Sequence, residues 1–234
     1  MKIGIIGAMD LEIATLREKM TITSTKTAAS MEFCEGTLNG TSVVVVKCGI
    51  GKVNAGMCVQ ILHDLFSVTH VINTGIAGSL RAEINIGDIV VSTDAVQHDM
   101  DVTALGYRTG QIPQIPVFSF EADKTLADTA ETVCREVNPD IQVFRGRIVS
   151  GDQFVSSKEK KDFLIETFDG CCTEMEGAAI AQAAYLNGLP FVVIRAISDK
   201  ADDSAQMDYP TFEHGAALHS AKLVEAMLSS VSPR

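Results

Sequence analysis

Basic residues are scarce in this chain. Its 234 residues include 19 Lys and Arg against 30 Asp and Glu, which gives a formal net charge of −11. Proteins that bind nucleic-acid backbones need clustered Lys and Arg side chains, because these displace the counterions around the phosphates. The acidic composition therefore argues against nucleic acid and anionic membranes as partners.

Long apolar runs are also missing. No stretch approaches the roughly 20 residues that a membrane-spanning helix needs. The N-terminal segment MKIGIIGAMD has an apolar run too short for the core of a secretory signal peptide, and Asp10 ends it. We therefore expect a cytoplasmic protein.

The spacings typical of redox and metal sites are absent. The six cysteines form no C-x-x-C pair, and no histidine stands at ligand spacing from them. Cys171 and Cys172 are adjacent and poorly placed to bridge one another. His98, Asp99 and Asp101 lie close together, but no further residue at a recognisable spacing completes a metal site. We expect reduced thiols and no metal ion.

No linker, internal repeat or low-complexity tract divides the sequence. Short β-branched runs alternate with helical patterns, and Asn39-Gly40 between two apolar runs predicts a hairpin. The alternation predicts one α/β domain over residues 1–234, a three-layer αβα sandwich with a mixed central sheet. The predicted strands include residues 2–7, 33–38, 42–48, 70–73, 86–92, 143–150 and 191–194.

Two predicted strands end in glycine-rich turns, Gly49-Ile50-Gly51 and Thr74 to Gly78. Glycine lets backbone approach a ligand closely, although it serves close helix–strand packing equally well. The first strand, by contrast, leads into GIIGAMDLE, which is not the G-x-G-x-x-G fingerprint of dinucleotide sites. A phosphate about 4 Å from Glu12 would meet roughly 4 kcal/mol of repulsion at an effective dielectric of 20. Water or a neutral group is the better guest there.

The residues from Thr173 to Asp203 hold the densest group of chemically active side chains. Glu176 opens a small-residue helix, and Arg195, Ser198 and Asp199 follow the apolar strand. In open α/β sheets, ligands bind beyond the carboxyl ends of strands. This segment therefore predicts a site.

Each candidate has an ordinary structural alternative. Thr173-x-x-Glu176 fits a capping box, Glu12 fits a carboxylate that complements a helix dipole, and Asp199 fits a turn. Phe154, just after a strand, suits core packing as well as stacking on a flat ring. Local sequence alone leaves these alternatives open.

Six blocks together resemble the 5′-methylthioadenosine/S-adenosylhomocysteine nucleosidase family of the nucleoside phosphorylase superfamily. They keep their order and cover nearly the whole chain. The resemblance implies hydrolysis of the N-glycosidic bond to adenine and a 5-thio-substituted ribose, without metal or cofactor, by a homodimer. The blocks are residues 4–12, 49–53, 73–78, 149–152, 174–176 and 195–199.

The resemblance also implies roles for the polar residues. Asp199 would protonate adenine N7, held by Ser198 and Arg195. Glu12 would activate the attacking water. Glu176 would accept hydrogen bonds from the ribose hydroxyls. Burial is expected to raise the pKa of Asp199, which would keep it protonated for this task.

The remaining contacts implied by the resemblance are mostly apolar. Phe154 would stack on adenine, Val155 would present its backbone to the base, and Met175 would pack on the sugar. Other substrate contacts would be Met9, Ile50, Ala77, Gly78 and Phe212. The neighbouring subunit would add Val102, Leu105 and Pro113 to the pocket for the 5′ substituent.

Two positions depart from the family pattern. Ile76 stands where many members have Ser, and Leu105 stands where an aromatic is expected.

The substrates that the resemblance implies are methylthioadenosine and adenosylhomocysteine, with 5′-deoxyadenosine as a further candidate. The rival functions are a nucleosidase for a futalosine-type 5′-substituted adenosine, a purine nucleoside phosphorylase, and an NAD-binding or nucleotide-sensing protein.

Overall fold

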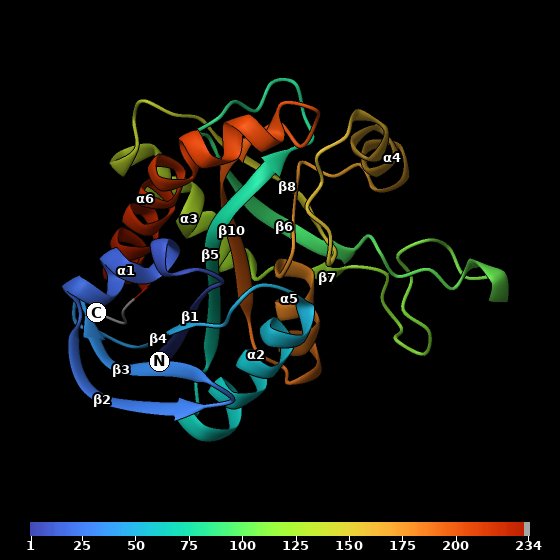
Figure 1. The fold of residues 1–234 in the computed structure, drawn as a ribbon. Coiled ribbons are helices and arrows are strands. Elements are labelled where there is room, and N and C mark those ends of the chain that lie inside the picture. Colours follow the sequence, from blue (N-terminus) through green and yellow to red (C-terminus); the bar gives the residue numbers. More distant parts are fainter. Residues whose placement is uncertain (232–234) are drawn as a thin grey trace.

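A ten-stranded mixed sheet forms the centre of the computed structural model, which describes residues 1–231 (Figure 1). Four neighbouring strands run parallel, in the order β4, β1, β5, β10. Their apolar residues are buried on both faces, as continuous β-branched runs predict. These strands are β1 (Lys2–Gly7), β4 (Thr41–Lys47), β5 (His70–Ser79) and β10 (Phe191–Asp199).

An antiparallel ribbon extends one side of the sheet. β2 (Thr21–Ala28) pairs with β3 (Met31–Leu38), and β3 pairs with β4. Asn39 and Gly40 both have positive φ in the turn between β3 and β4, so the predicted hairpin is confirmed. β2 is exposed from Thr21 to Thr27, which left no apolar pattern from which to predict it.

The other side of the sheet curls into a closed ring. β10 pairs with β5 on one edge and with β6 (Ile89–Gln97) on the other. β8 (Val143–Ser150) joins β6 to β9 (Cys172–Glu174), and β9 returns to β5. β7 (Phe120–Glu121) adds a short pairing to β6. The sequence predicts a mixed sheet but not this closure, which depends on pairings between distant segments.

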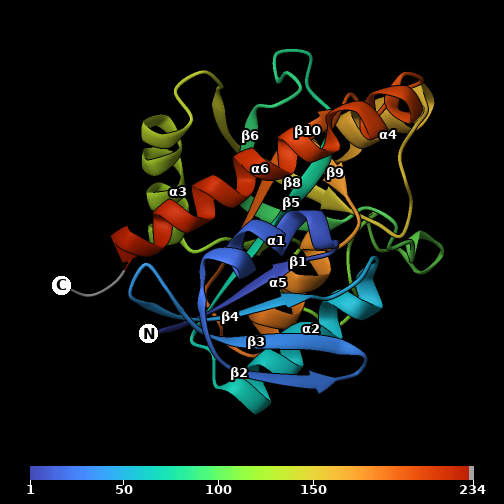
Figure 2. The same cartoon turned by 60° about the vertical axis from the view of Figure 1, so that its left-hand side comes forward.

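Helices cover both faces, so the predicted αβα layering is confirmed. α1 (Asp10–Lys19), α3 (Lys124–Val137) and α6 (Ala205–Val231) pack on one face (Figure 2). α2 (Lys52–Phe66) and α5 (Gly177–Leu186) pack on the other. α4 (Lys158–Phe168) covers a smaller apolar cluster. Burying one Leu or Phe side chain in these layers contributes about 1.5–3 kcal/mol.

The glycine-rich segment after residue 73 is strand, not a turn. Residues 74–78 stay within β5 and pair with β10, with one register shift between Ile197 and Asp199. β10 likewise continues to Asp199, five residues past the predicted strand. The prediction ended both strands too early because it took glycine and polar residues as strand ends. Inside a ring of neighbours these residues remain hydrogen-bonded, so their side chains are held by strands.

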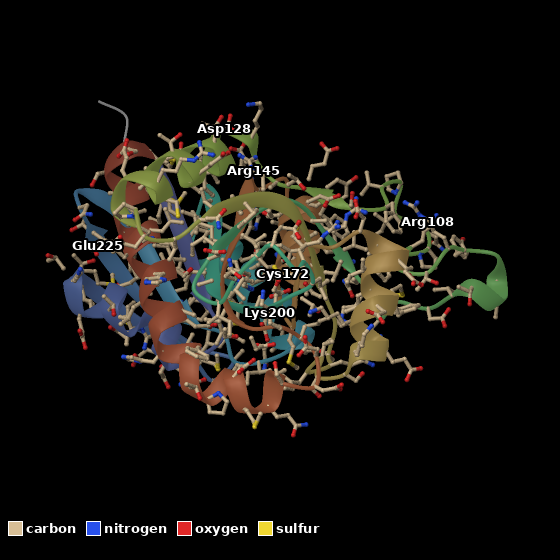
Figure 3. All side chains as sticks on the ribbon, turned by 90° about the horizontal axis from the view of Figure 1, so that it is seen from above. Arg108, Asp128, Arg145, Cys172, Lys200 and Glu225 are labelled. Atoms are coloured by element: carbon tan, nitrogen blue, oxygen red, sulfur yellow. The ribbon has the colours of Figure 1, made fainter. Side chains whose placement is uncertain are left out.

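An irregular loop of residues 98–119 projects from the body of the protein (Figure 1). It carries the short helix η1 (Thr103–Leu105), and Figure 3 places Arg108 on this outlying part. The Arg108 guanidinium lies 3.1 Å from the centre of the Phe118 ring, which ties the loop to its own base. Within residues 1–231, no helix is long and apolar enough to cross a membrane.

Candidate active site

A cavity of about 440 Å³ lies where β1, β5 and β10 end. Because these strands are parallel, their carboxyl ends meet at one edge of the sheet. A smaller cavity of about 40 Å³ beside Val155 shares part of this lining, including Gly78, Phe154 and Asp199. The predicted residues that line the main cavity are Met9, Glu12, Ile50, Ala77, Gly78, Phe154, Met175, Glu176, Ser198 and Asp199.

Glu12 is buried against two backbone segments. Its Oε2 accepts hydrogen bonds from the N–H groups of Ala8 (2.6 Å) and Met9 (2.9 Å), and its Oε1 accepts one from Ile76 (3.1 Å). Burial raises the pKa of Glu12, although the charge of Arg195 opposes the shift. The carboxylate therefore caps the start of α1 and also faces the cavity, which combines the two alternatives left open by the sequence.

Glycine at position 75 makes room for this carboxylate. A Cβ there would lie 2.5 Å from Glu12 Oε1. The carboxylate of Glu12 thus occupies the space that a side chain at position 75 would fill.

Glu174, rather than Glu176, caps helix α5. Its carboxylate accepts hydrogen bonds from the N–H groups of Glu176 (3.1 Å) and Gly177 (2.8 Å), and from the Ser150 hydroxyl. The capping box that the sequence allowed between Thr173 and Glu176 therefore does not form. Glu174 reaches the helix start because it lies on β9, at the point where the strand turns into the helix.

Arg195 forms a buried ion pair with Glu174 beneath the cavity. Its guanidinium also donates to Asn73 Oδ1 and to the carbonyl of Ile194. Arg195 does not line the cavity, so the expected substrate contact is not formed. Its hydrogen-bond partners do not include Asp199, which it was expected to hold. Within the structure its charge offsets a cluster of buried carboxylates, which would otherwise repel one another.

Glu176 faces the cavity from the start of α5. Its Oε1 accepts a hydrogen bond of 2.7 Å from the Gly51 N–H. Gly51 has φ of +97°, a conformation that glycine adopts without strain. Burial and the charge of Glu174 raise the pKa of Glu176 to about 8.

Asp199 lies on the opposite side of the cavity, at the end of β10. Its Oδ2 accepts a hydrogen bond from the Ser198 hydroxyl, and its Oδ1 accepts one from the Ala201 N–H, both of 2.8 Å. Burial raises the pKa of Asp199. A Cβ at Gly78 would lie 2.6 Å from Oδ1, so this glycine leaves the space that the carboxyl group occupies.

Aromatic and sulfur-containing side chains form the mouth of the cavity. Phe154 is half exposed, and Tyr209 meets it edge-on with ring centres 5.6 Å apart. The Tyr209 hydroxyl lies 3.4 Å from the Met9 sulfur. Phe154 therefore presents an open ring face rather than a packed core position.

The sequence prediction missed Tyr209. The structure places Tyr209 in the cavity lining, whereas Phe212 is 42% exposed on α6 and outside that lining. The two residues are three positions apart on one helix, so helical periodicity alone does not choose between them. Thr173, Glu174, Ala8 and Ile76 complete the lining.

The residues predicted to serve a neighbouring subunit lie on the projecting loop. Val102, Leu105 and Pro113 do not line the cavity of their own chain, and Leu105 is 75% exposed. Asp99 forms an ion pair with Lys52, with 2.6 Å between Oδ1 and Nζ. Residues 1–231 contain no group of three or more His, Cys, Asp or Glu that could hold a metal ion.

A mixed sheet closed into a ring, helices on both faces and buried carboxylates at the strand ends are what a nucleoside phosphorylase-type fold presents. The model of the Phosphorylase superfamily matches residues 2–229. A 5′-methylthioadenosine/S-adenosylhomocysteine nucleosidase of Anoxybacillus flavithermus is 46% identical, over 99% of this chain and 100% of its own. The chain belongs to this superfamily and, within it, to the 5′-methylthioadenosine/S-adenosylhomocysteine nucleosidase family.

Solved structures agree with this placement. The Neisseria meningitidis nucleosidase in complex with methylthio-immucillin-A has a TM-score of 0.94 and 39% identity, and the match covers 98% of this chain and 99% of that one. A futalosine hydrolase of Helicobacter pylori has a TM-score of 0.93 and 35% identity, covering 98% of both chains.

Proposed function

We propose that this protein hydrolyses the N-glycosidic bond of 5′-methylthioadenosine and S-adenosylhomocysteine, releasing adenine and a 5-thio-substituted ribose. One observation carries the proposal: Glu12, Glu176 and Asp199 come from distant parts of the chain and line one cavity. Hydrolysis of a nucleoside needs an acid beside the nucleobase, a hydrogen-bond acceptor for the ribose hydroxyls and a general base that activates water.

Asp199 supplies the acid. An adenine anion is a poor leaving group, so protonation of the base at N7 lowers the barrier to bond cleavage. Burial raises the pKa of Asp199, which favours the protonated form that this step needs. A positioned proton transfer of this kind typically contributes about 10²–10⁴-fold to the rate.

Glu12 and Glu176 act on the sugar side. The ribose becomes cation-like as the bond to adenine breaks, and nearby carboxylates stabilise that charge. Glu176 accepts hydrogen bonds from the ribose hydroxyls, while Glu12 orients and deprotonates the attacking water. Met175 packs on the sugar, and the open face of Phe154 stacks on the base, with Val155 at its edge.

Hydrolysis is favoured over phosphorolysis by the start of α1. A phosphate at a helix start is held by free backbone N–H groups. Here the N–H groups of Ala8 and Met9 already donate to Glu12. A phosphate would have to displace this carboxylate or meet its charge, which costs roughly 4 kcal/mol at about 4 Å in an effective dielectric of 20.

A larger 5′ substituent, as in a futalosine-type adenosine, is the second candidate. Ile50 and Phe154 are each at least half exposed at the mouth of the cavity, so the 5′ side is open within this chain. The likeness to the Helicobacter pylori futalosine hydrolase adds to this candidate.

We further propose a homodimer. The projecting loop exposes Leu105, and the outer surface of α2 and α5 exposes Val53 and Leu186. In the dimer, Val102, Leu105 and Pro113 of one subunit close the 5′ side of the other subunit's cavity. The six free cysteines suit the reducing cytoplasm, and the acidic charge gives no basis for nucleic acid or anionic membrane as partners.

Adenine release in phosphate-free buffer tests the function. Methylthioadenosine, adenosylhomocysteine, 5′-deoxyadenosine and a futalosine-type adenosine are compared, with and without added phosphate. We expect release from the first two without phosphate and no stimulation when phosphate is added. Turnover that requires phosphate would make the protein a phosphorylase, and tight NAD binding without adenine release would place it outside the hydrolases.

A further inference from the structure

Asp99 lies at the base of the projecting loop, two residues after strand β6, and its carboxylate binds two distant segments. Oδ1 accepts a hydrogen bond of 2.6 Å from the Lys52 ammonium group, and Oδ2 accepts one of 3.0 Å from the Asp152 N–H. The side chains of Asp99 and Lys52 are 17% and 20% exposed. Burial favours the neutral acid, but the hydrogen bonds from Lys52 and Asp152 outweigh it and lower the pKa of Asp99. The carboxylate is therefore charged and holds both partners.

A further hydrogen bond joins the same two segments directly. The Asp152 carboxylate accepts from the backbone N–H of Lys52 at 2.9 Å, in the first turn of α2. Gly51 leaves room for this contact, since a Cβ there would lie only 3.1 Å from Asp152 Oδ1. Lys52 and Asp152 are thus linked twice, once directly and once through Asp99. We call these three residues the Asp99 clamp.

The two segments that the Asp99 clamp joins both carry side chains of the cavity. Ile50 precedes the clamp on one segment and Phe154 follows it on the other, and both line the main cavity. Beside Ile50, the Gly51 N–H donates to Glu176 at 2.7 Å. The clamp residues themselves are not part of the lining of the main cavity. They can therefore affect a ligand there only through the segments that they hold.

The Asp99 clamp differs from an ordinary ion pair at the surface. A single exposed pair contributes little, because water screens it and two flexible side chains must be ordered. Asp99 instead binds one side chain and one backbone N–H, from residues 47 and 53 positions away in the sequence. One acceptor with partners on two separate segments fixes how far apart those segments stand.

We propose that Asp99 is a positioning residue, which holds the segments of Ile50 and Phe154 at the separation that the bound nucleoside requires. The inference rests on the proposed function, because it takes a nucleoside as the ligand. Without Asp99 the two segments are held together for only part of the time. A ligand then binds only the fraction of molecules in the competent arrangement, which weakens the apparent affinity by that fraction. Once the ligand is bound, the acids stand as they do in the wild type.

Asp99→Ala removes both acceptor oxygens and tests this role. We expect KM for methylthioadenosine to rise about 10-fold, which corresponds to a competent fraction of roughly one in ten. The change in kcat should stay below about threefold, because the bound state is restored. Calorimetry should show adenine binding weakened by a similar factor of about 10, without any need for turnover.

Lys52→Met breaks the same link from its other end. It removes the ammonium group and keeps the backbone N–H that donates to Asp152, so KM should rise about as much as in Asp99→Ala. The double variant Lys52→Met/Asp99→Ala should raise KM no further than the larger single effect, since both changes remove one link. Independent effects that multiply to about 100-fold would show that the two residues act separately and would overturn the Asp99 clamp.

Asp94 provides a matched control on strand β6. It forms an ion pair of 2.6 Å with Arg147, its side chain is 12% exposed, and it lies outside the cavity lining. Asp94→Ala should lower the melting temperature at least as much as Asp99→Ala but leave KM within about twofold of the wild type. Equal rises of KM in the two variants, or an Asp99→Ala variant that changes only kcat or only the melting temperature, would overturn the positioning role.

The same measurements separate the Asp99 clamp from the proposed function. Wild-type hydrolysis together with an unchanged KM in Asp99→Ala would overturn the clamp and leave the function standing. Adenine binding by a wild type that hydrolyses no nucleoside would overturn the function, and weaker adenine binding in Asp99→Ala would still support the clamp. A wild type that does not bind adenine would overturn both.

Discussion

The floor and the mouth of the cavity are built in opposite ways. The floor consists of Glu12, Glu174, Glu176 and Asp199 above the Arg195 guanidinium, all of them buried. Their carboxylates accept hydrogen bonds from backbone N–H groups or from neighbouring side chains. The geometry of the charged groups is therefore fixed before any ligand arrives, which is how electrostatic stabilisation of a transition state avoids reorganisation.

The mouth, in contrast, has few fixed contacts. Ile50 and Phe154 are at least half exposed, and the main links between mouth residues are the ring contact of Tyr209 with Phe154 and its contact with Met9. The difference teaches that one chain fixes its buried acids by itself but leaves the mouth open, which in the proposed dimer a second subunit closes. Substitutions on the floor should change the rate, and substitutions at the mouth should change selectivity.

The largest expected effect is at Asp199 on the floor. Asp199→Asn removes the proposed proton donor but keeps the size, so we expect adenine release to fall about 10³–10⁴-fold, at the upper end for one proton transfer. Asp202→Asn, which changes a neighbouring acid outside the cavity lining, is the control and should stay within a few-fold of wild type. Adenine release near the wild-type rate in Asp199→Asn would remove this residue from the mechanism.

Glu176→Gln should reduce turnover about 100-fold, because an amide accepts ribose hydrogen bonds more weakly than a carboxylate.

The same substitution should also change how stability depends on pH. The pKa of Glu176 is raised in the folded state, so its stabilising contribution is present below pH 4.5 and is lost as pH rises toward about 8. Glutamine does not titrate, so the variant should gain on the wild type across this window.

Thermal melting of Glu176→Gln and wild type at pH 5 and pH 8.5 measures this second effect. A relative gain of about 1 kcal/mol corresponds to roughly 2–4 °C for a chain of this size. A melting difference that is the same at both pH values would show that Glu176 titrates normally.

At the mouth, Tyr209 and Phe212 form a matched pair of aromatic residues on one helix. Tyr209→Ala should raise KM for methylthioadenosine about 10-fold, because it removes a ring that lines the cavity. Phe212→Ala should change KM less than twofold, since its ring lies outside the lining. The reverse order of effects in a Michaelis analysis would return Phe212 to the pocket and remove Tyr209.

The smallest effect on the chemistry is expected at Leu105. Leu105→Glu places a charge on the exposed loop, so it should weaken the proposed dimer and raise KM for methylthioadenosine a few-fold, with kcat changed less. Sedimentation and Michaelis parameters measure the two effects on one sample. A variant that stays dimeric with an unchanged KM would place Leu105 outside the shared pocket.

Much of the floor could be predicted from sequence because strand ends and helix starts have local signals. Glu12 follows a strand and opens a helix, and Asp199 ends an apolar run, so both fall at the carboxyl edge of the sheet. The alternatives at Glu12 could not be separated, because the same carboxylate caps α1 and faces the cavity. At Glu176 the capping signal was misleading, because Glu174 on β9 reaches the helix start first.

The ring closure and the mouth were beyond local signals. The pairing of β10 with both β5 and β6 joins segments about 100 residues apart, and no periodicity encodes it. Tyr209 and Phe212 share one helical pattern and differ only in the direction that tertiary packing gives them. Thr173 was considered only as a capping residue, although it lies opposite Gly78 in the sheet and lines the cavity.

Two glycines of strand β5 leave space for side chains that belong to other elements. Glu12 occupies the position above Gly75, and Asp199 occupies the position above Gly78. Adding a single methyl group at either glycine would collide with a carboxylate oxygen and push that acid out of alignment. A survey of harmful variants should therefore find substitutions of Gly75 and Gly78 as damaging as substitutions of the acids. These two glycines take no part in the chemistry, but the acids need the space that they leave.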